Sequence, residues 1–507
     1  MTLQNDTGET LSMAINTQAS KSAEIRARLN HPIIDSDGHM IEFEPAILDY
    51  LNQVGGKSLV ENFQSWANEN LFSWYRLSPE ERRDKRPTRS TWWGIPTKNT
   101  LDRATASIPG LLYERLDEFG LDFAVIYPTF GLPVPHIEDD ELRRGTCRAF
   151  NDYYGDTYRE FSDRLTPAAI IPMNTPQEAI EELEHAVNEL GLKAIVCAGY
   201  VRRPIPAIAR EYPGAERQAF WLDTFGLDSA YDYDQFWAKC EELRVAPSFH
   251  SSGMSWGSRT SPTNYIYNHI GMFGAAGEAL CKSLFMGGVT RRYPRLKFAF
   301  LEGGVGWACS LYADLVGHWE KRNLQSLENL NPANLDQKLL RQLYQRYGGK
   351  MVEGKLDQLE ERNAVLISRR EDPAMLDEFA ACKIERVEDI RQLFVSSFYF
   401  GCEADDPVNA WAFDTKINPF GACLKVLFGS DIGHWDVPDI AEVVEETYEL
   451  VEKEIITEAD LRDFVFTNPV SFYASLNSEF FKGTVVEQEV EKILGQTKEA
   501  GNRSTAH

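Results

Sequence analysis

Eight short apolar runs constrain the fold of this chain more than any other feature, because each ends in a polar or glycine-rich turn and is separated from the next by helix-like sequence. They lie at residues 32–39, 123–131, 165–173, 192–199, 245–253, 296–304, 398–403 and 423–431. Runs rich in Val, Ile, Leu and Phe are typical of parallel strands that helices bury on both faces. Eight such units predict an α/β fold, a (β/α)8 TIM barrel with its active site at the carboxyl ends of the strands.

Three segments are too long to be ordinary connections between these strands. Residues 52–110 follow the first run, residues 200–232 follow the fourth and residues 317–395 follow the sixth. Because each insertion comes after a strand, we expect all three on the C-terminal face of the barrel, where they can cover the site. The alternative is that some of them are contacts between subunits, above all residues 317–395.

The boundaries of the barrel follow from the composition of the two ends. Residues 31–480 are predicted to form the barrel with its insertions. Residues 1–30 are polar and lack strand character, so we expect a flexible N-terminal arm, or one that packs on a neighbouring subunit, and residues 481–507 are expected to be a C-terminal tail.

Charge and composition narrow the partners and the compartment. The net charge of -25 disfavours nucleic acid and anionic membranes, which would repel the chain. No apolar run approaches the roughly 20 residues of a membrane span, and no signal peptide is recognisable at the start. The eight cysteines include no C-x-x-C pair. We therefore expect a soluble cytoplasmic protein that acts on a small molecule.

Unusual polar side chains stand at the ends of four predicted strands. Asp37 and His39 end the first, His250 the fifth, Glu302 the sixth and Asp431 the eighth. Alternate residues of a strand point the same way, so Asp37 and His39 can bind one ion together. Two imidazoles with two carboxylates suit Zn²⁺, Mn²⁺ or Fe²⁺. The structural alternatives are a polar strand end, a core histidine and a helix N-cap.

These motifs resemble those of the amidohydrolase superfamily, specifically the amidohydrolase-related branch with aminocarboxymuconate-semialdehyde decarboxylase and resorcylate-type decarboxylases. The similarity covers residues 32–475 apart from the insertions, and it is carried in order by "IIDSDGH", "APSFHSSG", "RRYPRLKFAFLEGG", "LFGSDIGHWD" and "FTNPVSFYA". The resemblance implies one catalytic divalent ion held by Asp37, His39, His250 and Asp431. In that family the last of these residues is also the proton acceptor.

Two positions depart from the pattern of the family. Asp37 stands where relatives keep His or Glu, and Glu302 stands where many relatives place a catalytic His. Glu302 is therefore a candidate acid or base, a further ligand, or a hydrogen-bond partner of a ligand. His434 matches the histidine of the family's S-D-x-x-H motif, so it is a candidate for orienting Asp431 or touching substrate, with a structural role as the alternative. The fourth strand ends without a lysine that could bridge two metals, which favours one ion.

The first insertion contains "RRDKRPTRSTWWG", which concentrates cations and indoles. Arg89 is a candidate partner for a substrate carboxylate, and Trp92 and Trp93 are candidates for an apolar wall of the binding site. The alternative is a solvated surface loop. Near the first strand, Asp35 is expected to be structural, and Glu42 is left open between the same cavity and a solvated loop.

The fold and the ion set together predict an enzyme. The main hypothesis is a metal-dependent hydrolase, in which metal-activated water attacks a carbonyl or amide-like centre of a small aromatic or cyclic substrate and Asp431 takes the proton. The alternative is a non-oxidative decarboxylase of an aromatic or unsaturated acid, in which Asp431 or Glu302 protonates carbon. A catalytically inactive metal-binding protein is the third hypothesis. By analogy with relatives we expect a homodimer or higher homo-oligomer.

Overall fold

Each of the eight predicted runs contains one strand of a single eight-stranded parallel sheet. The computed structural model describes residues 2–4, 10–12, 19–91, 94–215, 218–256, 259–359 and 375–504. The strands, in their order around the sheet, are β3 (Ile34–Met40), β4 (Phe123–Pro128), β5 (Leu165–Ile171), β6 (Ala194–Cys197), β9 (Pro247–Phe249), β10 (Phe298–Phe300), β11 (Phe398–Glu403) and β12 (Lys425–Gly429).

The first and last strands, β3 and β12, lie side by side and close the barrel. The backbone N–H of Asp431 donates to the carbonyl oxygen of Asp37 over 3.0 Å. A Cβ at Gly429 would come within 2.8 Å of the Cβ of Asp37, so the two strands approach each other at a position where only glycine leaves room. The prediction of a TIM barrel is confirmed.

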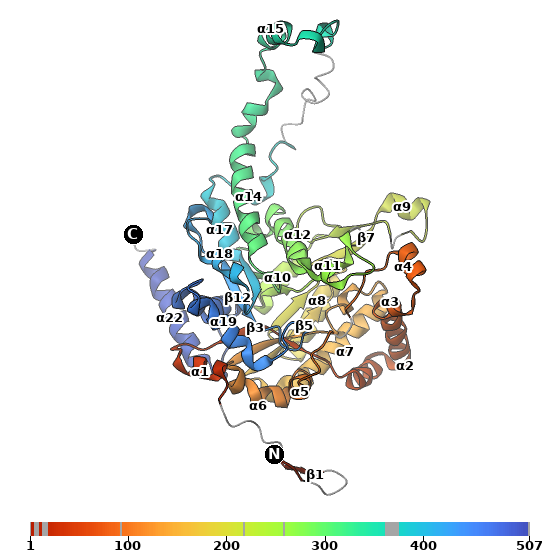
Figure 1. Cartoon of the computed structure of the whole chain (residues 1–507), viewed down its shortest axis with the longest axis vertical. Helices are drawn as coiled ribbons and strands as arrows, with labels where there is room; N and C mark the ends of the chain where they lie inside the picture. The colour runs from red at the N-terminus through yellow and green to blue at the C-terminus, as the bar shows by residue number, and fades with distance from the viewer. Residues whose placement is uncertain are drawn as a thin grey trace.

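Helices cover the outside of the barrel. Every residue of β4 and β5 is buried, because side chains fill the barrel interior on one face and helices pack on the other. The covering helices are α6 (Pro109–Phe119), α7 (Asp140–Tyr158), α8 (Pro176–Glu184), α10 (Asp234–Leu243), α12 (Met272–Met286), α14 (Gly306–Arg322), α17 (Glu388–Ser397), α19 (Val443–Glu452) and α21 (Asn468–Ala474). Figure 1 shows this ring around the strands.

The first insertion is bound to the loop that follows β9. Its helices are α2 (Glu44–Asn70), which begins before the insertion, α3 (Ser73–Arg76), α4 (Pro79–Lys85) and α5 (Thr100–Thr105). The indole N–H of Trp74 donates to the carbonyl of Pro262 over 2.9 Å, and the backbone N–H of Arg89 donates to that of Ser261 over 2.9 Å. These bonds hold the insertion over the carboxyl end of the strands. The second insertion forms an antiparallel pair, β7 (Val201–Pro204) and β8 (Phe220–Asp223), with α9 (Pro206–Glu211) between them.

The third insertion projects away from the barrel instead of covering its mouth. Helix α14 carries the chain outward, and α15 (Gln337–Tyr347) lies at the far end (Figure 1). No residue of α15 is buried. Of the two roles considered for this insertion, its course does not suit covering the site, and contact between subunits stays a prediction.

Parts of both chain ends pack on the barrel. Helix α1 (Lys21–Arg28) lies within the predicted N-terminal arm, and it buries Ser22 and Ile25. The Ser22 hydroxyl donates to the carbonyl of Ala441 over 2.6 Å, which fixes this helix beside α19. Ahead of it, β1 (Thr2–Gln4) pairs with β2 (Thr10–Ser12).

At the other end, Phe481 and Val486 are buried within the predicted tail, and so is Val490 in α22 (Glu487–Ser504). Apolar side chains therefore hold the first part of that tail against the barrel. Among the helices in the described ranges, none has the length and apolarity needed to cross a bilayer.

Candidate metal centre

Acidic and imidazole side chains from different strand ends converge inside the carboxyl-terminal mouth of the barrel. The candidate ligand atoms of Asp37, His39 and His250 all lie within 4.8 Å of one another. The same limit holds for a second group that shares one residue with the first, namely His39, Glu302, Asp431 and His434. The four residues predicted as metal ligands are thus brought together, and both further catalytic candidates join them.

The two histidines present their Nε2 atoms to the same point. His39 Nδ1 lies 3.1 Å from the carbonyl oxygen of Pro128, so Nδ1 carries the proton and donates it. The lone pair of His39 Nε2 then faces His250 Nε2 at 3.2 Å, Asp37 Oδ1 at 3.6 Å and Asp431 Oδ1 at 3.5 Å. A deprotonated nitrogen among carboxylate oxygens is a geometry suited to a cation.

Several carboxylate oxygens in this cluster are buried without a hydrogen-bond donor. In the part of the chain that the structure describes, Asp37 Oδ1, Glu302 Oε2 and both carboxylate oxygens of Asp431 have no aligned hydrogen bond, although His434 Nδ1 lies 2.5 Å from Asp431 Oδ1. Glu302 Oε2 lies 3.0 Å from His250 Nε2, but the two groups are not aligned as a hydrogen bond. A buried acceptor without a partner is costly, and a divalent ion would satisfy all of these oxygens at once. The donor set therefore fits a divalent cation.

The electrostatics of the cluster favour the neutral forms of its members. Burial raises the pKa of Asp37, Glu302 and Asp431 well above the ordinary range, and the nearby carboxylates raise it further. Burial also lowers the pKa of His39 well below its usual value and that of His250 to about 3. Within the described ranges, no lysine or arginine forms an ion pair with these three carboxylates. A bound cation is the natural counter-charge.

Backbone conformation and the buried hydrogen bonds of Asp35, called the Asp35 brace below, orient the side chains of the site. Glu302 and Asp431 have φ angles of 55° and 49°, a left-handed conformation that is uncommon outside glycine. Asp35 accepts from the Ser430 N–H at 3.0 Å, from the Ser430 hydroxyl at 2.6 Å and from the Asp37 N–H at 3.1 Å. Asp35 thus ties the two strands that carry Asp37 and Asp431, which is the structural role expected for it.

His434 bridges Asp431 and the loop after β4. Its Nδ1 lies 2.5 Å from Asp431 Oδ1, and its Nε2 lies 3.1 Å from the hydroxyl oxygen of Thr129. The ring also lies against His39, with 4.1 Å between centroids. His434 can therefore position Asp431, as one of its two predicted roles requires.

Glu42 takes neither of the two roles left open for it. Its carboxylate accepts from the backbone N–H groups of Phe130 and Gly131, both at 2.9 Å, and from the hydroxyl of Tyr154 at 2.9 Å. Glu42 is buried and holds the loop after β4, outside the ion cluster and away from solvent. Its position three residues after His39 does not reveal this, because its partners come from distant parts of the chain.

An acidic inner cavity of about 240 Å³ adjoins the cluster. Glu302, Glu403, Asp406 and His269 are among the residues that line it. Sequence analysis missed Glu403 and Asp406, although "FYFGCEADD" places them at and after the end of β11, where barrel sites gather. Burial and neighbouring carboxylates raise the pKa of Glu403 to about 7.

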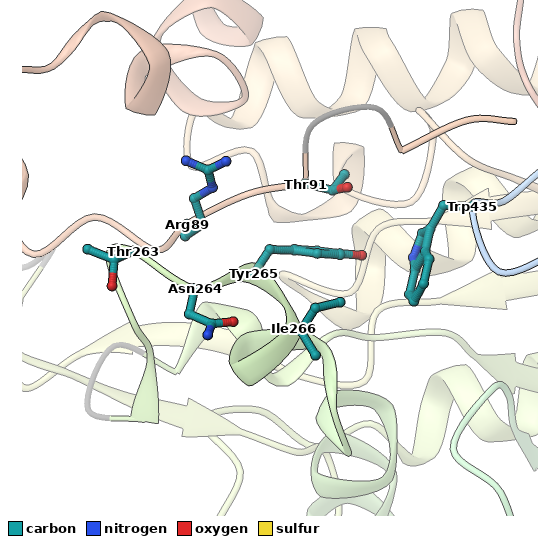
Figure 2. A pocket seen from close by; sticks show the side chains of 7 residues that line it. All are labelled: Arg89, Thr91, Thr263, Asn264, Tyr265, Ile266 and Trp435. Carbon is teal, nitrogen blue, oxygen red and sulfur yellow. The ribbon is translucent and has the colours of Figure 1, made fainter. Parts of the chain in front are cut away.

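An outer cavity of about 340 Å³ lies between the first insertion and the loop after β9. Figure 2 shows its lining: Arg89, Thr91, Thr263, Asn264, Tyr265, Ile266 and Trp435. The guanidinium of Arg89 points away from the ring of Tyr265 and lies 3.7 Å from the centroid of Trp74. Arg89 thus lines this cavity, and its pairing with a substrate carboxylate stays a prediction. The other two predicted substrate-binding residues, Trp92 and Trp93, lie outside the described residues.

Aromatic contacts separate the two cavities. The ring of His269, which lines the inner cavity, lies 5.3 Å from that of Tyr265 and 5.4 Å from that of Trp435, which both line the outer one. Phe273 continues this row to the ion cluster, because its ring lies 6.0 Å from that of His269 and 5.0 Å from that of His250. An aromatic wall therefore runs from the outer cavity to the candidate ligands.

Comparison with known sequences finds a matching family and a similar enzyme. The Amidohydrolase family model matches residues 34–348. The chain is 28% identical over 114 residues to gamma-resorcylate decarboxylase from Polaromonas sp. (strain JS666 / ATCC BAA-500). That match covers 22% of this chain and 34% of the relative, so it spans about a third of the relative's length.

Several solved structures are similar over most of this chain. An amidohydrolase from Mycobacterium avium subsp. paratuberculosis K-10 is 18% identical, covers 88% of this chain and 98% of its own, and gives a TM-score of 0.49. A dihydroxybenzoic acid decarboxylase from Polaromonas sp. JS666, with bound manganese and 2-nitroresorcinol, is 16% identical. That match covers 89% of this chain and 99% of the decarboxylase, with a TM-score of 0.45. 5-Carboxyvanillate decarboxylase from Novosphingobium aromaticivorans DSM 12444, complexed with manganese, is 14% identical. That match covers 88% of this chain and 96% of the decarboxylase, with a TM-score of 0.45.

Proposed function

This chain belongs to the amidohydrolase family, and from that premise we propose that it is a metal-dependent decarboxylase of a small aromatic acid. The observation that carries the proposal is Asp431, a buried acid within the cluster of candidate ligand atoms, whose pKa is raised well above its ordinary range. Such an acid holds its proton more strongly than an ordinary carboxyl does, and it can deliver that proton to carbon. The similarity over 114 residues to gamma-resorcylate decarboxylase supports the same chemistry.

Asp37, His39, His250 and Asp431 would hold the ion. A mixed set of nitrogen and oxygen donors suits Mn²⁺, Zn²⁺ or Fe²⁺. When bound, the ion would supply positive charge for the carboxylate and an adjacent oxygen of the substrate. The backbone and the Asp35 brace set the spacing of these ligands before any ion arrives, which lowers the cost of forming the site.

Asp431 moves the proton in this proposal. Oδ1 of Asp431 lies 2.5 Å from His434 Nδ1 and 3.5 Å from His39 Nε2, so its other oxygen, Oδ2, is the one that can carry a proton. Asp431 gives this proton to the ring carbon that bears the carboxylate. The bond between that carbon and the carboxylate then breaks, its electron pair restores the aromatic ring, and carbon dioxide leaves.

Glu302 and His434 control where that proton resides. After burial, the negative charge of Glu302 is the largest cause that raises the pKa of Asp431, so it favours the protonated acid. His434, held by Thr129, keeps Asp431 in place from the other side. Both are positioning residues here, because they act through Asp431.

The charge of the site favours decarboxylation over hydrolysis. Hydrolysis requires the ion to acidify a bound water, and each additional anionic ligand weakens that effect. Asp37, Glu302 and Asp431 are all buried in the cluster, and Glu403 adds a further carboxyl nearby. Protonation of carbon instead uses an acid of raised pKa, which these neighbours produce.

A product assay in heavy water tests the proposal. The protein is loaded with Mn²⁺ and incubated in D₂O with 2,6-dihydroxybenzoate and a panel of other ortho-hydroxybenzoates. We expect carbon dioxide release and one deuterium at the ring carbon that lost the carboxylate. Turnover of amide or lactone substrates, with no carbon dioxide from any acid in the panel, would instead support the hydrolase hypothesis.

A further inference from the structure

The inner cavity beside the candidate metal centre holds more negative charge than one ion can offset. Glu302, Glu403 and Asp406 line it, and none of its described lining residues is a lysine or an arginine. The adjoining cluster adds Asp37 and Asp431. A divalent ion balances two of these five carboxylates, and a proton on Asp431 neutralises a third. Two negative charges are then left for another positive group.

No positive charge of the described residues acts on Glu403 or Asp406. Burial raises the pKa of Glu403 to about 7, and the next causes are the negative charges of Asp436, Asp405 and Asp406. Burial also raises the pKa of Asp406, and the carboxylate of Asp405 adds to this effect. A cation in the cavity would stabilise the ionised forms that burial penalises.

One acceptor in the cavity wall is buried without a hydrogen bond. The side chain of Glu302 is 3% exposed, and its Oε2 atom has no aligned donor among the described residues. His250 Nε2 lies 3.0 Å away. When His250 binds an ion through Nε2, that nitrogen has no proton to donate, so Glu302 still lacks a donor. A ligand with an N–H group in this cavity supplies one.

The geometry of the cavity favours an organic cation over a second metal ion. In the described part of the chain, the candidate ligand atoms that lie within 4.8 Å of one another form the two groups at the metal centre, and neither group includes Glu403 or Asp406. The cavity of about 240 Å³ is also far larger than the ~30 Å³ that one water molecule occupies. It therefore has room for an ammonium group and the carbon that bears it.

Aromatic rings complete a wall that suits an ammonium group. Phe273 and His269 line the cavity together with the carboxylates. Burial lowers the pKa of His269, so its imidazole is neutral at neutral pH and does not repel a cation. Carboxylates beside aromatic rings bind organic cations, because both attract positive charge.

Glu302 links the cavity to the metal centre. It lines the cavity, and its candidate ligand atom lies within 4.8 Å of those of His39 and Asp431. A substrate carboxylate at the ion therefore lies beside the cavity, and a substituent of the substrate's ring can enter it. An acid with a cationic substituent is a zwitterion, which the net charge of -25 repels less than a plain anion.

We propose that the inner cavity binds a protonated amino group of the substrate, and that the preferred substrates are aromatic acids with an aminoalkyl substituent. The substrate class rests on the proposed function, whereas the cation site does not. Glu403 and Asp406 accept hydrogen bonds from the ammonium group, and Glu302 accepts one at the boundary with the metal centre. These three residues determine specificity, while Asp431 delivers the proton.

Matched pairs of substrates test the preference. Aminomethyl groups are placed at ring position 3, 4 or 5 of 2-hydroxybenzoate, and each acid is compared with its hydroxymethyl counterpart, which has a similar size and no positive charge. We expect at least one aminomethyl acid to show a kcat/KM about 10- to 100-fold above that of its counterpart on Mn²⁺-loaded protein. Equal kcat/KM values at every position would overturn the proposal.

Two variants and a matched control locate the preference. Glu403→Gln and Asp406→Asn each remove one charge from the lining with little change of shape, so each should lower the ratio of the two kcat/KM values about tenfold. The control is Asp405→Asn, because Asp405 belongs to the same segment but is exposed and lies outside the lining. It should keep the wild-type ratio. An unchanged ratio in both lining variants would count against the cation site.

Binding of benzylamine separates the cation site from the proposed reaction. This amine has no carboxylate, so calorimetry on Mn²⁺-loaded protein reports the cavity alone. We expect wild type and Asp405→Asn to bind it, and Glu403→Gln to bind it about tenfold more weakly. If this result is obtained and no acid loses carbon dioxide, the cation site stands and the proposed function fails. If 2,6-dihydroxybenzoate loses carbon dioxide and benzylamine does not bind, only the cation site fails.

Metal analysis tests the competing occupant of the cavity. We expect one Mn²⁺ per chain in wild type and in Glu403→Gln. Two Mn²⁺ per chain in wild type, with one of them lost in Glu403→Gln, would assign the cavity to a second metal ion and overturn the proposal.

Discussion

The Nε2 atoms of His39 and His250 face each other across 3.2 Å, and Asp37 Oδ1 lies within 3.6 Å of the first and 3.9 Å of the second. His39 donates its Nδ1 proton to the carbonyl of Pro128, so its Nε2 lone pair points at this contact, and a lone pair on His250 Nε2 would oppose it. A cation at this point turns that repulsion into attraction, which explains why the residues converge although burial penalises each charge.

Removal of a proposed ligand should remove the ion. We expect His250→Ala to lower bound Mn²⁺ to a small fraction of the wild-type content, and to lower carbon dioxide release by about 1000-fold or more, because the site keeps too few donors. Metal analysis of the purified proteins measures the first effect. His318→Ala is the control, since His318 is exposed on α14. Full metal content in the His250 variant would remove it from the ligand set.

Loss of the acid should separate chemistry from binding. Asp431→Asn keeps an oxygen donor but cannot deliver a proton, so we expect turnover to fall by about 100- to 10,000-fold while substrate still binds. Turnover and equilibrium binding of the same aromatic acid are measured on Mn²⁺-loaded protein. Near-normal turnover in this variant would transfer the proton donor to another residue, and Glu302→Gln would then be the next variant to measure.

Metal affinity should depend on pH. Burial raises the pKa of Asp37, Glu302 and Asp431, so these carboxyls keep their protons to a higher pH than ordinary ones do. The ion binds deprotonated ligands, so a ligand such as Asp37 releases its proton on binding, and affinity falls as the pH falls. We expect the Kd for Mn²⁺ to rise about tenfold per pH unit for each proton released. Calorimetry in buffers of different ionisation heat counts these protons, and an affinity that is independent of pH would contradict the prediction.

The Asp35 brace should contribute to stability through its acceptors. Asp35→Ala leaves the N–H groups of Asp37 and Ser430 without partners, so we expect the free energy of unfolding to fall by about 2–4 kcal/mol. Asp35→Asn keeps an acceptor for both and should cost less. Urea unfolding of the three proteins at pH 8 measures the difference.

The pH dependence of that comparison has a defined sign. Burial raises the pKa of Asp35 from 3.8 to about 6, so the folded state disfavours its ionised form. The resulting cost is absent below pH 3.8 and complete above about pH 6. Wild type should therefore lose stability relative to Asp35→Asn as the pH rises through this window, by up to about 3 kcal/mol. A difference that does not change with pH would mean that the carboxyl is not buried as described.

The sequence by itself determined the eight strands of the barrel and the residues at their ends. Strand burial is a local property, since a run of apolar residues between turns has few alternatives in an α/β chain. The positions of Asp37, His39, His250, Glu302 and Asp431 then follow, because parallel strands bring their carboxyl ends to one side.

Only the tertiary structure decided the partners of these residues and the course of the insertions. Glu42 binds backbone groups beyond β4, and Glu403 joins the inner cavity from β11, although both are far in sequence from most of their neighbours. The sequence left the third insertion open between a cover and a contact between subunits, and the structure makes it a projecting arm. Periodicity and composition indicate which side chains each segment buries. The course of an insertion and the residues that a side chain contacts depend instead on segments that are distant in the chain.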